Sequence, residues 1–472
     1  MPSKYIITKY GQVYTWRNGM KKQIITFVLM LVFLSIAGFM RAEDNWPHWR
    51  GPYHNGIADA NNLPMNWSTT ENIVWRTELP SWSAATPIIW GDRIFITSPS
   101  KSEPKPEPEK KQPDEQSQTQ RRRRSALDPG GPKLLLFCVA KKNGKILWER
   151  ELDNKNQIHR KQNDATPSPV TDGKHVWAVT GTGIVAAFDM DGKPIWKKDL
   201  QQDYGPFGHN WGYGSSPLLH EGILIIEVLH GMNTDDPSYL VSLDAETGKE
   251  LWHQERPTDA QRESPDAYTT PVVLEHEGKT QIVISGGDYV TGHDFKTGKE
   301  IWRAGGLNPL KRPNYRVVPT PIIVDGIIYA PTRKKPLLAL KVGGTGNITE
   351  SHLVWKYEGS AAPDVPSPVS DGKHFYMVDD RGLVTCLDAK TGALIWGPET
   401  TTEGIVSASP ILVEGKLYIV NEKGVTSIVS VSPEFKLLAT NELDGSYTLA
   451  SPAISGSQLF IRTSTHLYCI GQ

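Results

Sequence analysis

Short apolar runs that alternate with polar residues recur along most of the chain, separated by turns that contain glycine. Eight times a small residue and a proline precede such a run, and an x-Gly turn and a second alternating run follow. Alternation with a period of two predicts β-strands, and tight glycine turns predict hairpins. The pattern therefore predicts an all-β protein that repeats one unit eight times. The eight prolines are Pro87, Pro169, Pro217, Pro271, Pro321, Pro368, Pro410 and Pro452.

The second half of each unit is an apolar strand, an Asp, a Thr-Gly turn and a short strand that ends in tryptophan. Leu243–Trp252 and Leu387–Trp396 are the clearest copies. Trp355 closes a fifth unit whose turn is replaced by the longer loop Gly343–Thr349. The seventh unit has Pro433-Glu434-Phe435 at its turn and no tryptophan. Each unit is thus predicted to form a meander of four short strands.

One sheet alone exposes both of its apolar faces to water. In a ring of such sheets, each sheet packs against its two neighbours and both faces are buried. The eighth unit ends at Gln472 after supplying only its inner strands. Asn72–Arg76, upstream of the first proline, has the alternation and the tryptophan of the missing outer strand. We therefore predict an eight-bladed β-propeller of four-stranded antiparallel blades, closed by an N-terminal strand that completes the last blade.

The N-terminal residues have the pattern of an export signal over about residues 20–42. A basic flank is followed by the apolar stretch Ile24–Met40, and Ala42 precedes an acidic start. Residues 1–19 are interpreted as an upstream extension. We predict cleavage and a periplasmic or secreted protein; an uncleaved membrane anchor is the alternative, because the apolar stretch approaches the length that spans a bilayer. Since no cysteine lies near the end of the stretch, a lipid anchor is not expected.

The predicted propeller domain covers residues 43–472, with one insertion in its first blade. Residues 101–132 are rich in Pro, Glu, Lys and Gln and include Arg121–Arg124. This composition cannot bury apolar area, so we predict a disordered surface loop. The four arginines could dock on an acidic partner, although a solubilising insertion is the interpretation we prefer.

Composition excludes several classes of function. A net charge of −1 argues against a nucleic-acid binder that neutralises phosphates. Cys138, Cys386 and Cys469 lie within separate apolar strands, which excludes a disulfide scaffold and a multi-thiolate metal cluster and indicates buried thiols. The chain contains no His-Glu-x-x-His, no phosphate-binding Gly-Lys-Ser/Thr loop and no Gly-x-Ser-x-Gly elbow. No catalytic residue is assigned.

The repeat resembles that of the pyrroloquinoline-quinone (PQQ) propellers, Ala-x-Asp-x-x-Thr-Gly-x-x-x-Trp. Leu243–Trp252 and Leu387–Trp396 match it, and Trp46–Pro52 is similar to the opening motif of exported bacterial PQQ-binding-like β-propeller repeat proteins. The resemblance covers about residues 46–472 and implies the fold more than an activity. We expect Trp46–Pro52 to fasten the N-terminal segment to the ring.

Two kinds of relative are implied by this resemblance. The quinoprotein alcohol dehydrogenases have an adjacent Cys–Cys disulfide above the cofactor, an active-site Asp and a Ca²⁺ held by carboxylate and amide ligands. This chain has no adjacent cysteines. Outer-membrane-protein assembly factor B is a non-enzymatic, lipid-anchored scaffold, and its anchoring cysteine has no counterpart after the apolar stretch of this chain. The resemblance thus implies the ring without assigning either function.

The strand order predicts a loop-rich face. Turns between first and second strands and between third and fourth strands are short, whereas the connections on the other face are long. Functional groups concentrate on long loops held by a rigid scaffold, so a ligand site is expected on that face. The long connections are Lys101–Pro132, Lys197–Tyr213, Val228–Ser238, His253–Ala267 and Arg303–Val317.

Seven residues of these loops are candidates for ligand binding. The aromatic and glycine-rich loop Tyr204–Tyr213 could stack on a flat ligand, although a packed aromatic loop over the channel is the interpretation we prefer. Lys311, Arg312 and Arg316 could bind an anion, although a solvated charge cluster is the interpretation we prefer. The candidates are His209, Asn210, Trp211, Tyr213, Asp266, Tyr268 and Arg316.

Metal binding is not predicted. Asp235, Asp236, Glu263 and Asp266 carry oxygen ligands suited to Ca²⁺, but their spacing does not form a calcium loop. We therefore prefer the interpretation that these carboxylates hold no metal.

We favour a non-catalytic exported protein, expected to be a monomer, that binds an envelope or secreted protein, a peptide or a saccharide through its loop-rich face. The alternative is a PQQ-dependent periplasmic oxidoreductase acting on alcohols or sugars, with PQQ and Ca²⁺ in a central funnel. Carboxylate and amide groups that converge on a flat slot would favour the cofactor. A broad aromatic surface would favour a macromolecule.

Overall fold

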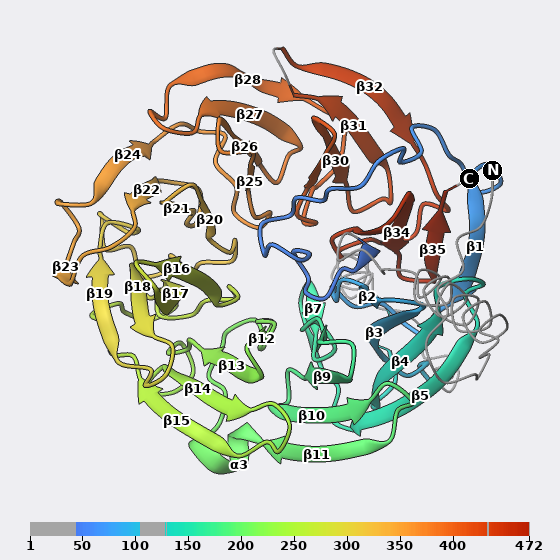
Figure 1. The fold of residues 1–472 in the computed structure, drawn as a ribbon, viewed down its shortest axis with the longest axis horizontal. Coiled ribbons are helices and arrows are strands. Elements are labelled where there is room, and N and C mark those ends of the chain that lie inside the picture. Colours follow the sequence, from blue (N-terminus) through green and yellow to red (C-terminus); the bar gives the residue numbers. More distant parts are fainter. Residues whose placement is uncertain (1–43, 104–127, 129, 432–433, 472) are drawn as a thin grey trace, which may run out of the picture. The chain divides into compact units, whose positions relative to one another are not determined.

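A computed structural model describes residues 44–103, 128, 130–431 and 434–471. The predicted export signal and most of the insertion at 101–132 lie outside the described residues. Eight sheets are arranged around a central axis, each starting near the axis and extending outward (Figure 1). In seven of them four strands lie side by side in chain order and pair antiparallel, so the predicted meander is confirmed.

The strands of the first seven blades run in order from the axis outward. Blade 1 consists of β2 (Ile88–Trp90), β3 (Arg93–Pro99), β4 (Leu134–Ala140) and β5 (Ile146–Asp153). Blade 2 consists of β8 (Val170–Thr171), β9 (His175–Val179), β10 (Ile184–Asp189) and β11 (Pro194–Asp199). Blade 3 consists of β12 (Leu218–His220), β13 (Ile223–Val228), β14 (Tyr239–Asp244) and β15 (Glu250–Glu255). Blade 4 consists of β16 (Val272–His276), β17 (Lys279–Gly286), β18 (Tyr289–Asp294) and β19 (Glu300–Ala304). Blade 5 consists of β20 (Ile322–Val324), β21 (Ile327–Ala330), β22 (Leu337–Lys341) and β24 (Leu353–Tyr357). Blade 6 consists of β25 (Val369–Ser370), β26 (His374–Val378), β27 (Leu383–Asp388) and β28 (Leu394–Thr400). Blade 7 is β29 (Ile411–Val413), β30 (Lys416–Val420), β31 (Thr426–Ser430) and β32 (Lys436–Asn441).

The eighth blade combines strands from both ends of the described chain. Its inner strands are β33 (Ala453–Ser455), β34 (Gln458–Arg462) and β35 (His466–Ile470). Its outer strand is β1 (Ile73–Glu78), which pairs antiparallel with β35 and lies beside it in Figure 1. Trp75 lies opposite Cys469 in this pairing. The prediction of eight blades closed by an N-terminal strand is therefore confirmed.

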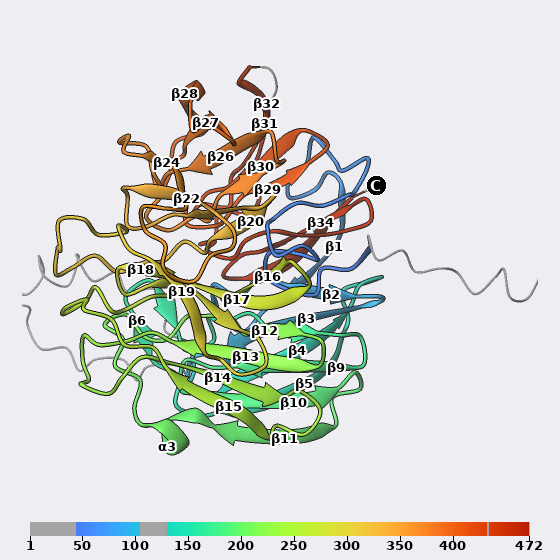
Figure 2. The same cartoon turned by 60° about the vertical axis from the view of Figure 1, so that its left-hand side comes forward.

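Three small elements were not predicted from the sequence. β6 (Ile158–His159) and β7 (Gln162–Asn163) form a hairpin between blades 1 and 2, and Figure 2 shows β6 at the end of the ring where long connections gather. β23 (Gly346–Asn347) adds a parallel strand to the edge of blade 4. The single turn of helix α3 (Leu200–Tyr204) begins at Asp199, whose carboxylate accepts hydrogen bonds from two backbone N–H groups.

Five of the eight junctions between blades join the two halves of the repeat. There, the tryptophan that ends one outer strand packs on the glycine of the Thr-Gly turn, or of its variant, in the next blade. A Cβ atom at Gly248 would lie 2.5 Å from the Trp196 ring, and the Trp196 indole N–H donates to the carbonyl of Ala245 at 2.9 Å. Glycine and tryptophan of the motif are therefore partners across a junction. The pairs are Trp75–Gly144, Trp148–Gly192, Trp196–Gly248, Trp252–Gly298 and Trp355–Gly392.

Two tryptophans of outer strands do not make this contact. Trp302 packs on Gly292 of its own blade and donates its indole N–H to the Gln281 side chain at 2.8 Å. The other is Trp396, and the sequence explains why. Its neighbour is blade 7, which has no Thr-Gly turn. Instead the Trp396 ring faces Phe435 at a centroid distance of 5.7 Å, and its indole N–H has no hydrogen-bond partner among the described residues.

A belt of hydroxyl groups links the inner ends of the blades. The residue before each repeat proline is Ser or Thr, and its backbone N–H donates to the hydroxyl of the equivalent residue in the next blade. Thr86 donates to Ser168 and Ser409 to Ser451, both at 3.0 Å. Six of the eight junctions carry this bond. The hydroxyl satisfies a buried N–H, which gives the small residue of the repeat its role.

Replacing Gly248 by alanine is expected to lower the free energy of unfolding by about 2–3 kcal/mol, because the new methyl group must displace the Trp196 ring and φ is +72°. Gly222→Ala is the matched control: φ is +75° but nothing lies within 4 Å of the added atom. The control should lose only about 1 kcal/mol of backbone strain. Urea denaturation compares the two, and equal losses would contradict the proposed contact.

Candidate functional site

A central funnel opens on the loop-rich face and has a volume of about 420 Å³. Residues from all eight blades line it, since the hydroxyl belt runs around its lower wall. Above the belt, the wall comes from connections that follow outer strands, including Trp211, Tyr268, Arg316 and Asp364. The funnel is thus the place where loops of distant sequence meet.

The floor of the funnel is Trp49, in an N-terminal segment that crosses the middle of the ring (Figure 1). The next residue, Arg50, is 2% exposed, and its guanidinium donates to the carbonyls of Pro368 and Pro410, both at 2.7 Å. Burial lowers the pKa of Arg50 to about 9. Gly56 has φ of +79° and faces the Arg50 guanidinium so closely that a side chain would collide with it.

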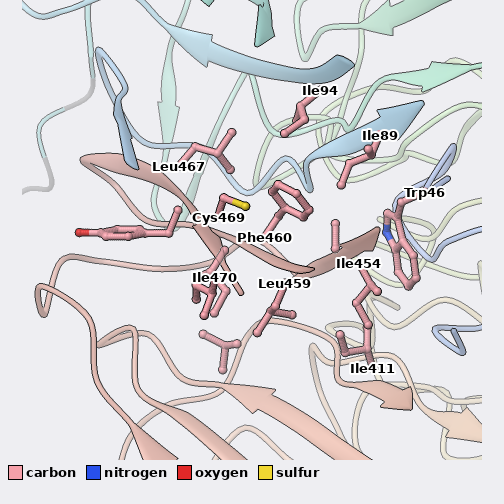
Figure 3. Packing of buried hydrophobic residues seen from close by; sticks show 14 of the residues in the cluster. Trp46, Ile89, Ile94, Ile411, Ile454, Leu459, Phe460, Leu467, Cys469 and Ile470 are labelled. Atoms are coloured by element: carbon pink, nitrogen blue, oxygen red, sulfur yellow. The ribbon is translucent and has the colours of Figure 1, made fainter. Parts of the chain in front are cut away.

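The same segment is also fixed at the junction of blades 8 and 1. Trp46 forms a β-bridge with Ile89 and is 1% exposed. Figure 3 shows its ring beside Ile89 and Ile454 in the core that β1 and β35 share. Trp46–Pro52 therefore fastens the N-terminal segment to the ring inside the channel, as expected. The segment closes the funnel at the end opposite its mouth.

Three of the seven predicted residues line the funnel together: Trp211, Tyr268 and Arg316. The Trp211 backbone N–H donates to the Tyr268 hydroxyl at 3.1 Å, and its indole N–H donates to Glu263 at 2.7 Å. The Arg160 guanidinium lies over the Trp211 ring at 4.9 Å from its centroid. Trp211 is thus held from three sides with its ring at the wall.

The other four predicted residues lie behind that wall and hold the loop in place. The Asp266 carboxylate accepts the backbone N–H groups of Asn210 at 2.8 Å and Met232 at 3.1 Å. The Tyr213 hydroxyl donates to the Glu227 carbonyl at 3.0 Å. His209 is 7% exposed and packs among the rings of Phe207, Tyr213 and Tyr268.

Burial dominates the pKa values of these groups. It lowers the pKa of His209 to about 3 and raises the pKa of Asp266 to about 7. Both side chains are therefore poor candidates for direct contact with a ligand in the funnel.

Sequence reasoning missed the hairpin β6–β7, which reaches over the mouth. Its Lys161 ammonium contacts the Glu422 carboxylate of blade 7 at 2.8 Å. The Gln162 amide donates to the carbonyls of Trp211 and of Gly212, the latter at 3.0 Å. Strands of two residues leave no periodic signal, so the sequence offered little to find it.

Arg333, Asp364 and Asp380 were also missed. The Asp364 carboxylate lies between two arginines, 3.5 Å from Arg316 and 3.7 Å from Arg333. Asp380 accepts the backbone N–H groups of Asp364 and Val365. Burial, and then the charge of Asp364, raise the pKa of Asp380 to about 6. These groups come from separate loops of blades 4, 5 and 6, and only the ring brings them together.

The side chains that line the funnel do not fit a quinone cofactor with a bound metal ion. Among the described residues, no three His, Cys, Asp or Glu side chains converge as metal ligands. The three cysteines lie buried in β4, β27 and β35, where burial raises the pKa of each thiol to about 12. The funnel carboxylates instead face arginines, a lysine or backbone N–H groups.

An eight-bladed ring of Asp-x-x-Thr-Gly repeats around a blind funnel defines a PQQ-like β-propeller. The chain belongs to the family described as outer membrane protein assembly factor BamB, whose model matches residues 133–398 and 314–471. BamB of Yersinia pestis is 22% identical over 328 residues, which are 68% of this chain and 75% of that protein. The resemblance inferred from the repeats is confirmed.

Solved structures show the same fold. BamB from Moraxella catarrhalis aligns with a TM-score of 0.52 at 14% identity, covering 72% of this chain and 95% of that one. Quinohemoprotein alcohol dehydrogenase from Comamonas testosteroni aligns with a TM-score of 0.60 at 10% identity, covering 92% and 81%. At these identities the likeness concerns the fold alone. Within the described residues, no helix has the length and apolar character needed to cross a membrane.

Proposed function

We propose that this protein is a non-catalytic scaffold of the cell envelope that binds a protein partner at its loop-rich face. Membership of the assembly-factor family supports a scaffold role, because the relatives carry the name of an outer membrane protein assembly factor. Export to the periplasm is part of this proposal, and it rests on the sequence pattern of residues 20–42.

The observation that carries the proposal is the composition of the funnel. Trp49, Trp211 and Tyr268 present aromatic surface, and Arg316 and Asp364 add charges beside it. Trp, Tyr and Arg are the residues that contribute most to protein interfaces. An extended segment of a partner can place side chains against the rings and hydrogen-bond the charged groups.

The groups around the funnel do not form a nucleophile and its base. His159 contacts Asp164 at 2.9 Å, which resembles the orienting half of a catalytic triad. Within the described part of the chain, however, no hydroxyl or thiol hydrogen-bonds to the His159 ring. The pair fixes the base of hairpin β6–β7, since Asp164 also accepts the backbone N–H of Gln157 at 2.7 Å.

The alternative, a PQQ-dependent oxidoreductase, would need oxygen ligands for Ca²⁺ beside a flat slot. The carboxylates of the described residues do not converge in that way, so we derive no redox step. A direct assay separates the two functions: purified protein with PQQ and Ca²⁺ should show no alcohol- or sugar-dependent dye reduction. Turnover with stoichiometric quinone would overturn the scaffold proposal.

A photocrosslinking residue at position 211 is expected to capture an envelope protein in cells of the source organism. The matched control is position 249, where Lys249 is exposed on the short turn of the opposite face. Arg316→Ala in the position-211 variant should reduce capture about tenfold, because a charged contact contributes on the order of 1.5–3 kcal/mol. Equal capture from both positions, or capture of saccharide alone, would contradict a protein partner.

A further inference from the structure

A second hollow lies beside the funnel on the loop-rich face, with a volume of about 390 Å³. Four of its eight lining residues are cationic and none is acidic. Arg333 lines both this hollow and the funnel. We name it the basic pocket; its residues are Arg312, Asn314, Tyr315, Arg333, Lys334, Lys335, Gly359 and Ser360.

Three of the four cations of the basic pocket are poorly compensated; the fourth, Arg333, faces the Asp364 carboxylate at 3.7 Å. Within the described residues, the Arg312 guanidinium and the Lys334 ammonium have no carboxylate or carbonyl partner, and Arg312 lies only over the Tyr315 ring. Lys335 donates to a single carbonyl, that of Glu358, at 3.4 Å. By contrast, the neighbouring Lys311 contacts Asp259 at 2.9 Å. Positive charge in the pocket is therefore left for a ligand to neutralise.

The two loops that carry these cations are tied together. The Tyr315 side chain is 7% exposed, and its hydroxyl donates to the carbonyl of Lys335. Arg333 donates to the carbonyl of Asn314, which fixes the guanidinium at the pocket wall. Lys334 has φ of +73°, a left-handed conformation that a lysine adopts only when its surroundings impose it. The charges are thus held close together before any ligand arrives, which lowers the cost of binding.

We propose that the basic pocket binds a phosphate ester. The Arg312 guanidinium can donate two parallel hydrogen bonds to phosphate oxygens, and the ammonium groups of Lys334 and Lys335 add point charges. Three uncompensated cations suit a phosphate, which carries up to two negative charges, better than a single carboxylate. The volume lies in the range of small-molecule sites. The phosphate can belong to a soluble phosphorylated sugar or to a phospholipid headgroup.

The test uses the full chain and two kinds of probe. Calorimetry with glucose 6-phosphate measures the soluble ester, and co-sedimentation with phosphatidylcholine vesicles, with and without phosphatidylglycerol, measures the headgroup. We expect one saturable site for at least one probe. The double variant Arg312→Gln/Lys334→Gln should weaken binding at least about tenfold, because two charge-assisted contacts are lost.

The matched control is Lys311→Gln, which removes an adjacent positive charge outside the pocket lining and should leave the affinity within about twofold. All the substituted side chains are exposed, so circular dichroism should show folded variants. Equal weakening by the control and the double variant would indicate general charge attraction and overturn the site. Failure to bind either probe, or equal affinity for glutarate, would overturn the phosphate assignment.

Discussion

Replacing Trp75 by alanine is expected to lower the free energy of unfolding by about 3–5 kcal/mol, the cost of deleting a large buried aromatic side chain. Trp75 is 9% exposed, packs on Gly144 of blade 1 and donates its indole N–H to the carbonyl of Lys141 at 2.7 Å. Together with Thr77, whose hydroxyl donates to the Gly144 carbonyl at 2.5 Å, it joins the closing strand β1 to the first blade. Its loss should weaken the closure of the ring as well as one junction, and urea denaturation measures the change.

Trp396→Ala is the matched control for this experiment, since it removes the same side chain from the equivalent position of blade 6. Trp396 is only half-buried, has no Thr-Gly turn beneath it and leaves its indole N–H without a partner among the described residues. The loss should be about 1–2 kcal/mol. Similar losses for Trp75 and Trp396 would show that the turn contact and ring closure contribute little.

The fold could be predicted because its signal is repeated. Eight prolines, the glycine turns and the tryptophans each recur at similar spacing, so that a weak local pattern becomes decisive. Trp75 could be assigned to blade 8 because that unit lacked an outer strand. The contact between Gly248 and Trp196 could not be predicted, since spacing along the chain shows that both residues belong to the motif but not that they meet across a junction.

The site was predicted less completely, for a physical reason. Residue type and loop length made Trp211 and His209 equally good candidates. In the folded ring, however, Trp211 lines the funnel and His209 lies behind its wall. Burial of a loop residue depends on which other loops lie over it, and those come from distant blades. Arg333 and Asp364 are ordinary charged residues in sequence, and they become a pair only because the β21–β22 loop of blade 5 meets the connection that follows β24.

Glu227 is a buried acid that no sequence motif singles out. It lies in β13 with no exposed surface, and one carboxyl oxygen has no hydrogen-bond partner among the described residues. The other oxygen lies 2.8 Å from the Thr269 hydroxyl, which is also 2.8 Å from the carbonyl of Ser285. A single hydroxyl proton cannot serve both acceptors, so a protonated Glu227 that donates to Thr269 satisfies the group best.

Burial accordingly raises the pKa of Glu227 to about 7, against the opposing effects of Thr269 and the Arg256 charge. A carboxyl whose pKa is higher in the folded state binds more protons there than in the unfolded chain. Stability should therefore fall as pH rises from about 4.5 to about 7, by roughly 3 kcal/mol in total, and then level off. Asp266, whose pKa is about 7, adds a change of the same sign.

Glu227→Gln isolates the contribution of Glu227, because glutamine keeps the shape and stays neutral at every pH. Near pH 5 the variant should match the wild type within about 1 kcal/mol, since the native carboxyl is then protonated as well. Near pH 8 it should be the more stable protein by up to about 3 kcal/mol, because the wild type must hold a buried charge. Urea denaturation at a series of pH values gives the difference between the two curves. A difference that stays constant with pH would mean that Glu227 ionises in the folded protein as it does in the unfolded chain, and that the ring supplies this carboxylate with solvent or a counter-charge.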